Sequence, residues 1–147
     1  MSSILFKSLS SATIERQVED AYNHALEKAF PRVKFEYPFA CDGCCEFEVD
    51  GKAHRLLIEY KYDDDMQSTV AKAKVLAQVL FYLKRFEKNG RPLPNVCMVA
   101  DKNECFVMHT NALLKHLDFE NVEWDKAPSG AGGNSDLVLA LSLKTKT

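Results

Sequence analysis

The stretch CDGCCEFEVDGKAHRLLIEYK, residues 41–61, decides the fold. Side chains of different character alternate over 41–49, which predicts a strand with two unlike faces. One face carries Asp42, Cys44, Glu46 and Glu48, and the other carries Cys45, Phe47 and Val49. Asp50-Gly51 is a hairpin turn signal, so we expect a return strand over 53–62 beside the first strand.

Elements with other hydrophobic periods flank this hairpin. Apolar residues recur at helical spacing over 12–30, which predicts a helix. Ser10 and Ser11 can cap this helix, and Pro31 ends it. The remaining pattern predicts strands at 33–37, 95–100 and 104–108, a long helix at 67–89 and a short helix at 111–117. The order α-β-β-β-α-β-β-α indicates an α/β fold class with a mixed central sheet flanked by helices.

Length and composition indicate one globular domain with a different tail. The chain has 147 residues and a mass of 16.6 kDa, which suits one core at roughly 150 residues per domain. Residues 128–135, PSGAGGNS, predict a flexible linker, and residues 136–143 are strand-like. We therefore expect a domain over 1–127 and a tail over 128–147 that leads to domains absent from this chain.

Hydropathy and cysteine content indicate a cytoplasmic protein without a membrane segment. We expect no membrane span, because no apolar run reaches the ~18 residues that cross a bilayer. The first residues do not resemble a signal peptide. Five cysteines, an odd number, favour reduced thiols. Cys41 and Cys44 lack the second ligand pair of a structural zinc site, so we expect buried thiols.

Two carboxylates and an ammonium group are expected to converge in the hairpin. Glu59 and Lys61 share one face of the return strand, and the hairpin can bring Asp42 beside them. Two close carboxylates repel, so one must bind a proton or a cation. Mg²⁺ prefers carboxylate oxygens together with water, and the backbone carbonyl of Tyr60 is a candidate third ligand. Such a site supports phosphodiester hydrolysis, with Lys61 polarising the attacking water.

At these residues the chain resembles the PD-(D/E)XK nuclease superfamily. The matching segments are Asp42-Gly43, Leu57-Ile58-Glu59-Tyr60-Lys61 and Gln78-Val79-Leu80-Phe81-Tyr82, and the likeness covers residues 14–108. The Gln-x-x-x-Tyr element is similar to that of nuclease domains in restriction enzymes and helicase–nucleases. The resemblance implies a restriction-endonuclease-like α-β-β-β-α-β core, and the predicted order of elements contains one. Cys41 stands where the motif has proline.

The activity implied by the resemblance is that of a Mg²⁺-dependent endodeoxyribonuclease. It would hydrolyse DNA phosphodiester bonds as the nuclease module of a larger bacterial restriction–modification or helicase–nuclease protein. Asp42, Glu59 and the Tyr60 carbonyl would hold Mg²⁺, which Mn²⁺ can replace. Lys61 would be the catalytic lysine.

The resemblance also implies roles for residues on the two helices. The acid of the first helix would be Glu15 or Glu19, and we select Glu19 because it lies one turn nearer the strands. Gln78 and Tyr82 would organise the active site. The residues expected to contact DNA are Lys74, Gln78, Tyr82 and Arg85.

Charge is separated along the chain in a way that suits a polyanionic substrate. The formal net charge is −2, yet residues 42–65 carry a local −5 and residues 66–91 a local +5. An acidic metal cradle beside a basic helix fits a site that positions phosphates. The acidic run 63–65 is expected as a loop before the long helix.

Other interpretations stay open for the same residues. Asp42 can be an ordinary turn residue, with Glu46 or Glu48 as the metal carboxylate in its place. Glu59 and Lys61 can form a surface cross-strand pair, which stabilises a fold little. The alternative function is a catalytically inactive nuclease-like module that binds DNA or a protein.

Overall fold

A sheet of five strands, in the order β1-β2-β3-β4-β5, lies at the centre of the fold. The computed structural model describes residues 2–62, 68–120 and 122–145. β3 and β4 are parallel, and the other neighbouring strands are antiparallel. The strands are β1 (Lys34–Glu36), β2 (Gly43–Val49), β3 (Lys52–Tyr60), β4 (Val96–Ala100) and β5 (Cys105–His109). The predicted α/β class with a mixed sheet is therefore confirmed.

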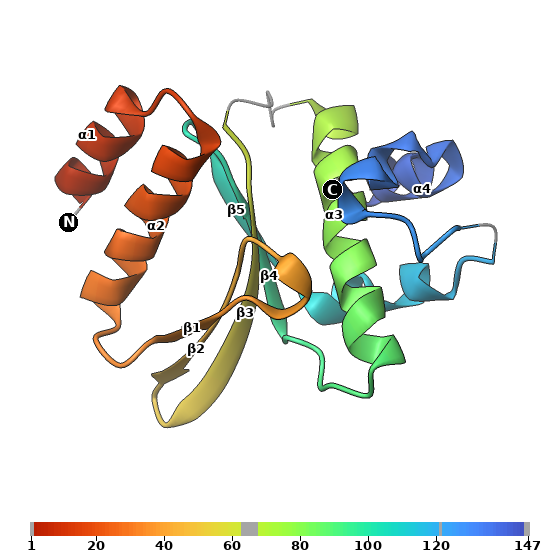
Figure 1. The fold of residues 1–147 in the computed structure, drawn as a ribbon, viewed down its shortest axis with the longest axis horizontal. Helices are drawn as coiled ribbons and strands as arrows, with labels where there is room; N and C mark the ends of the chain where they lie inside the picture. Colours follow the sequence, from red (N-terminus) through yellow and green to blue (C-terminus); the bar gives the residue numbers. More distant parts are fainter. Residues whose placement is uncertain (1, 63–67, 121, 146–147) are drawn as a thin grey trace.

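Helices cover both faces of this sheet (Figure 1). α1 (Ser2–Ser11) and α2 (Glu15–Ala29) lie on one face, and α3 (Thr69–Lys88) lies on the other. α4 (Ser135–Thr145) packs against α3. The order α2-β1-β2-β3-α3-β4 reproduces the α-β-β-β-α-β core that the sequence predicts.

The second half of β3, residues 56–60, is buried on both faces because it lies in the middle of the sheet. Leu56 and Ile58 point to the side of α2, and Leu57 points to the side of α3, each at most 5% exposed. Each of these side chains contributes about 1.5–3 kcal/mol through burial. Since successive side chains alternate, Glu59 points to the α3 side and Tyr60 to the α2 side.

α3 carries much of the core and begins directly after its cap. The Ser68 hydroxyl accepts a hydrogen bond from the Ala71 amide at 3.3 Å, which satisfies an otherwise unpaired donor of the first turn. The helix therefore begins at Thr69, and residue 67, where the prediction starts it, lies outside the described residues. The acidic run 63–65 lies outside the described residues.

The N-terminal region differs from the sequence prediction. Residues 2–11 form α1, which the pattern does not predict, and α2 begins at Glu15. Ser11 does not cap α2, because its hydroxyl donates to the Lys7 carbonyl at 3.0 Å within α1. Ile14 takes the N-cap position and is 56% exposed, so it does not belong to the buried stripe of the helix.

The tail also differs from its prediction. Residues 128–133 form a 3₁₀ helix and residues 135–145 form α4, so the predictions of a flexible linker and a strand are wrong. Leu137 and Leu141, one helical turn apart, are fully buried in the core that contains α3. Asn134 caps α4 by accepting a hydrogen bond from the Leu137 amide at 2.9 Å. The period of a continuous apolar run does not distinguish strand from helix, and packing on α3 decides the outcome here.

Three smaller features complete the fold. The short helix predicted at 111–117 is instead two 3₁₀ turns, Thr110–Ala112 and Leu114–Asp118. All five cysteines carry free thiols, and four of them are buried. In the parts of the chain that the structure describes, no helix combines the length and the hydropathy needed to cross a membrane.

Candidate active site

The carboxyl groups of Asp42 and Glu59 meet where β2 begins and β3 ends. Glu59 is 4% exposed, and Asp42 is half-buried. The two side chains lie close enough that the charge of Asp42 raises the pKa of Glu59, and Glu59 in turn acts on the pKa of Asp42. The structure thus brings together the two acids that the hairpin is predicted to place side by side.

The backbone of Tyr60 holds Asp42 in place. The Lys61 amide donates to the Ala100 carbonyl of β4 at 2.9 Å, so the Tyr60 amide points the other way, toward β2. β2 begins only at Gly43, and the Asp42 Oδ2 accepts the hydrogen bond of the Tyr60 amide at 2.7 Å instead. The Tyr60 carbonyl leaves the strand at the same edge as its amide, which places it on the Asp42 side.

Lys61 is fixed by contacts with two elements. Its Nζ lies 3.2 Å from the Glu59 Oε1 and donates to the Gln78 Oε1 of α3 at 3.0 Å. The other carboxyl oxygen of Glu59, Oε2, is buried without a hydrogen-bond partner among the described residues. A buried carboxyl oxygen without a partner costs free energy, so this atom favours a proton or a cation as its neighbour.

Burial perturbs both acids, and the charge of Asp42 also acts on Glu59. Burial, and next the charge of Asp42, raise the pKa of Glu59 to about 8, although the Lys61 ammonium opposes this. Burial also raises the pKa of Asp42, against the lowering effect of the Tyr60 amide and of Lys61. The pair therefore retains a proton near neutral pH unless a cation replaces it.

Both candidate acids of α2 lie near this pair. Glu19 is half-buried, and burial followed by the charge of Asp42 raises its pKa. Glu15 is exposed, and its charge is the weakest of those that raise the pKa of Glu59. Glu19 is more buried than Glu15, and its largest charge interaction is with Asp42. It therefore fits the role of the first-helix acid better than Glu15.

Two residues of α3 face the acids, as their spacing predicts. Gln78 binds Lys61 directly. The Tyr82 hydroxyl donates to the Ala40 carbonyl at 3.5 Å. Burial, and then the charges of Glu59 and Asp42, raise the pKa of Tyr82 to about 12.

The two basic candidates of α3 instead contact the C-terminal segment. Lys74 is exposed, and its side chain lies beside Gly132. Arg85 donates to the Lys126 carbonyl at 3.1 Å. Among the described residues, neither side chain forms a hydrogen bond or ion pair with Asp42, Glu59 or Lys61, so both flank the site.

Sequence reasoning missed the contacts that dock α2 on β3. The Tyr60 hydroxyl donates to the Asn23 Oδ1 at 2.8 Å, and the Tyr22 ring stacks on the Tyr60 ring at 5.8 Å between centroids. Tyr22 and Asn23 follow Glu19 at helical spacings of three and four residues, which put them on the same face of α2. That spacing is the signal that could have identified them.

A strained turn before Asp42 is a second feature that the sequence did not reveal. Phe39 and Ala40 have φ values of 58° and 59°, a left-handed backbone that costs a residue other than glycine roughly 1–2 kcal/mol. The Phe39 ring meets the Phe86 ring edge-on at 5.1 Å. The Arg91 guanidinium lies 5.6 Å from the first ring and 5.3 Å from the second.

The donors at this site suit a hard divalent cation with few protein ligands. Asp42 and Glu59 offer carboxylate oxygens, and the Glu59 Oε2 is buried without a partner. No cluster of three or more histidine, cysteine or acidic side chains with metal-binding geometry occurs among the described residues. Mg²⁺ fits this set, because it keeps several waters and is held by one or two carboxylates.

The alternative carboxylates lie away from the site. Glu46 is paired in register with Arg55 and Glu48 with Ala53, and both acids are exposed. Arg55 is four residues from Glu59 along β3, roughly 13 Å at the rise of a strand. Glu46 and Glu48 therefore do not replace Asp42 beside Glu59.

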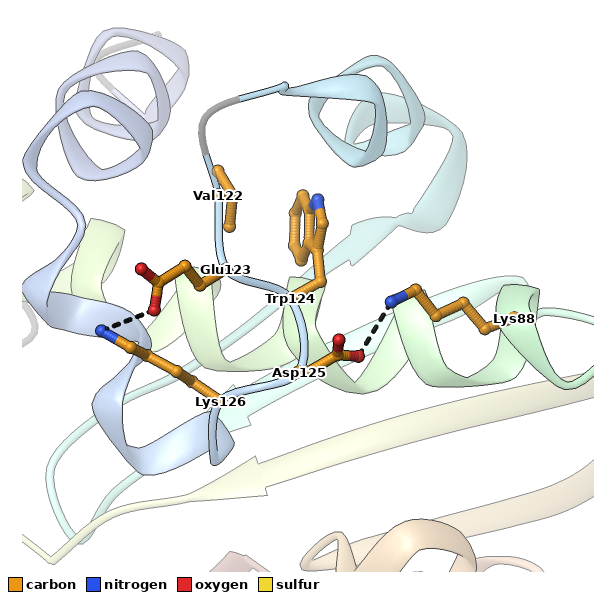
Figure 2. A pocket seen from close by; sticks show the side chains of 6 residues that line it. All are labelled: Lys88, Val122, Glu123, Trp124, Asp125 and Lys126. Atoms are coloured by element: carbon orange, nitrogen blue, oxygen red, sulfur yellow. Dashed lines mark hydrogen bonds and ion pairs between the residues drawn. The ribbon is translucent and has the colours of Figure 1, made fainter.

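A separate hollow on the C-terminal side of α3 does not contribute to this site. Lys88 points to Asp125 and Lys126 to Glu123 in Figure 2, with ion pairs of 2.9 and 3.0 Å beside Trp124. Both pairs are exposed, so they stabilise little. None of Asp42, Glu59 and Lys61 lines this hollow.

Comparison with known proteins gave no family model, no curated protein and no solved structure that matches this chain. The geometry of the site is therefore the basis for assigning a function. This geometry consists of the buried Glu59 beside the half-buried Asp42, a fixed lysine, and the face of α3 that carries Gln78 and Tyr82.

Proposed function

We propose that this protein is a metal-dependent deoxyribonuclease of the PD-(D/E)XK type. The observation that carries the proposal is the buried Glu59 Oε2 without a hydrogen-bond partner. The same carboxyl group lies beside Asp42, and its other oxygen is 3.2 Å from the Lys61 Nζ. Neighbouring acids that repel each other destabilise a protein core. The same two acids are useful in a site that binds a divalent cation and acts on a phosphodiester.

Each side chain has a defined task in this reaction. Asp42, Glu59 and the Tyr60 carbonyl would hold Mg²⁺ or Mn²⁺, with Glu19 reaching it through water. The bound cation would acidify a water molecule and neutralise charge on the scissile phosphate. Gln78 holds the Lys61 ammonium at 3.0 Å, so that Lys61 orients the attacking water and stabilises the negative charge of the transition state.

The substrate we propose is DNA, recognised through its phosphates. Lys74, Gln78, Tyr82 and Arg85 recur along α3 at intervals of four, four and three residues, which place them along one side of the helix. Phosphate contacts of this kind position a duplex without reading its sequence. We therefore assign target recognition to further domains of the same polypeptide, in a restriction–modification or helicase–nuclease protein. Five free thiols suit the reducing cytoplasm.

A plasmid assay tests this proposal. Supercoiled DNA incubated with the protein and Mg²⁺ or Mn²⁺ should become nicked or linear, and EDTA should prevent this. Lys61→Ala should abolish cleavage with an unchanged circular dichroism spectrum, whereas the matched control Lys115→Ala, at an exposed position, should cleave normally. DNA that stays intact under every metal condition, also with the full-length parent protein, would overturn the proposal. DNA binding without metal binding would instead indicate the inactive module.

A further inference from the structure

The turn that precedes Asp42 contains two consecutive residues in a conformation that neither favours. Phe39 and Ala40, with φ values of 58° and 59°, belong to the 3₁₀ turn Pro38–Ala40. Residues other than glycine rarely adopt this left-handed backbone, and it persists only where the surroundings enforce it. The chain reaches Asp42 two residues later, so the direction in which Asp42 enters the site depends on this turn.

Contacts from α3 and its C-terminal end hold the turn. The Phe39 ring packs edge-on against the fully buried Phe86 at 5.1 Å. Arg91 covers both rings, with its guanidinium 5.6 and 5.3 Å from their centres. On the other side of the turn, the Ala40 carbonyl accepts the hydrogen bond of Tyr82.

We infer that Phe39, Phe86 and Arg91 are positioning residues that place Asp42 in the site through this strained turn. β2 first pairs with β3 at Gly43, opposite Ile58, so no ladder hydrogen bond of the described sheet fixes Asp42 itself. Its position is set by the turn before it and by the Tyr60 amide beyond it. That this position of Asp42 serves metal binding rests on the proposed function. That the turn sets the position of Asp42 does not.

The Tyr60 amide reports the position of Asp42 without any metal or substrate. Its hydrogen bond to the Asp42 Oδ2 is 2.7 Å long, while the neighbouring Lys61 amide bonds to Ala100 of β4 at 2.9 Å. If Asp42 moves away, the Tyr60 amide should exchange its hydrogen with water faster. The Lys61 amide should not respond, because β4 still protects it, and it therefore reports global unfolding.

A pair of substitutions at Phe39 separates positioning from ordinary packing. Phe39→Ala removes the ring but keeps a side chain that disfavours left-handed backbone, so the turn should relax. Phe39→Gly also removes the ring, yet glycine adopts this backbone without strain, so the turn should persist. We expect Tyr60 exchange to accelerate roughly tenfold in Phe39→Ala, the factor that one left-handed residue represents, and to stay within roughly threefold of wild type in Phe39→Gly.

A milder variant at the protein surface tests the same role without endangering the fold. Arg91→Ala, which removes an exposed guanidinium, should accelerate Tyr60 exchange and leave Lys61 exchange unchanged. Glu36→Gln is the matched control, because it removes only the 3.6 Å ion pair with Arg91 and keeps the stacking on the rings. It should match wild type at both amides.

The outcomes distinguish this inference from the proposed function. Mn²⁺ titration should show weaker binding in Phe39→Ala than in Phe39→Gly, in the same order as Tyr60 exchange. Wild-type protein that binds no Mn²⁺ would contradict the proposed function. Hydrogen exchange at the Tyr60 amide would still test whether the turn positions Asp42. Equal acceleration in the alanine and glycine variants, or parallel acceleration of the Tyr60 and Lys61 amides, would overturn the positioning role.

Discussion

The buried carboxyl of Glu59 should make the free energy of unfolding depend on pH. Its pKa is raised from 4.5 to about 8 in the folded protein, chiefly by burial and then by Asp42. Between these values the folded protein keeps a proton that the unfolded chain has released. The stabilisation from this proton is fully present below the unfolded pKa and is lost as the pH rises through the folded pKa.

The size of the effect follows from one proton per molecule. Linkage gives a fall of about 1.4 kcal/mol in the free energy of unfolding per pH unit while only the folded state holds the proton. Between about pH 5.5 and 7.5 the loss should be about 2–3 kcal/mol. This is a large fraction of the stability of an ordinary domain, about 5–15 kcal/mol.

Glu59→Gln is the informative substitution, because its amide has nearly the shape of the protonated acid and stays neutral at every pH. Urea unfolding in EDTA at both pH values gives the two free energies directly. The difference in free energy between pH 5.5 and 7.5 should be smaller in the variant by the amount worked out above. Glu123→Gln, which changes an exposed acid paired with Lys126, should keep the wild-type dependence.

Titrating groups far from the site shift the pH dependence of all three proteins alike, so the comparison isolates Glu59 together with its coupling to Asp42. An equal pH dependence in wild type and Glu59→Gln would refute the reasoning. It would mean that Glu59 is ionised in the folded protein near neutral pH, and the unpartnered Oε2 would then need another explanation.

Two further substitutions test the packing and the active site. Leu141→Ala should lower the free energy of unfolding by about 2–5 kcal/mol, because the Leu141 side chain is fully buried. Leu143→Ala, at a position that is 62% exposed, should change it by less than about 0.5 kcal/mol. Similar changes for the two variants in urea unfolding would contradict the helical α4. Gln78→Ala should reduce the rate of DNA cleavage about tenfold or more, because Lys61 loses its hydrogen-bond partner. The affinity for Mn²⁺, measured by calorimetry, should stay unchanged. An unaltered cleavage rate would show that Gln78 does not position Lys61.

The hairpin and the site face of β3 could be predicted because local patterns specify them. Alternation over 41–49, the Asp50-Gly51 turn and the phase of Glu59 and Lys61 are all set within a few residues. The same phase places the acids toward α3, where Gln78 lies. These predictions needed only the period of a strand and a turn type.

The two terminal helices could not be predicted, because distant packing decides them. Residues 136–143 form an apolar run that suits a strand or a buried helix, and only the contact of Leu137 and Leu141 with the α3 core selects the helix. At the other end, Ser10 and Ser11 resemble a cap for α2, but they belong to the last turn of α1. Local capping signals do not show to which helix they belong.

The backbone that shapes the site was equally hidden from sequence reasoning. The left-handed turn at Phe39 and Ala40 contains no glycine, the residue that usually signals positive φ. Phe86 and Arg91, more than forty residues later, enforce it. Likewise, the bond between Asp42 and the Tyr60 amide depends on where β2 begins, and alternation alone does not fix that point.

The central claim is that Asp42 and Glu59 form a metal site, and the anomalous diffraction of crystals soaked in Mn²⁺ tests it most directly. The account predicts an anomalous peak bounded by the carboxylates of Asp42 and Glu59 and the carbonyl of Tyr60, and no such peak in crystals of Asp42→Asn. A map of the wild-type protein in saturating Mn²⁺ without a peak at that position would contradict it.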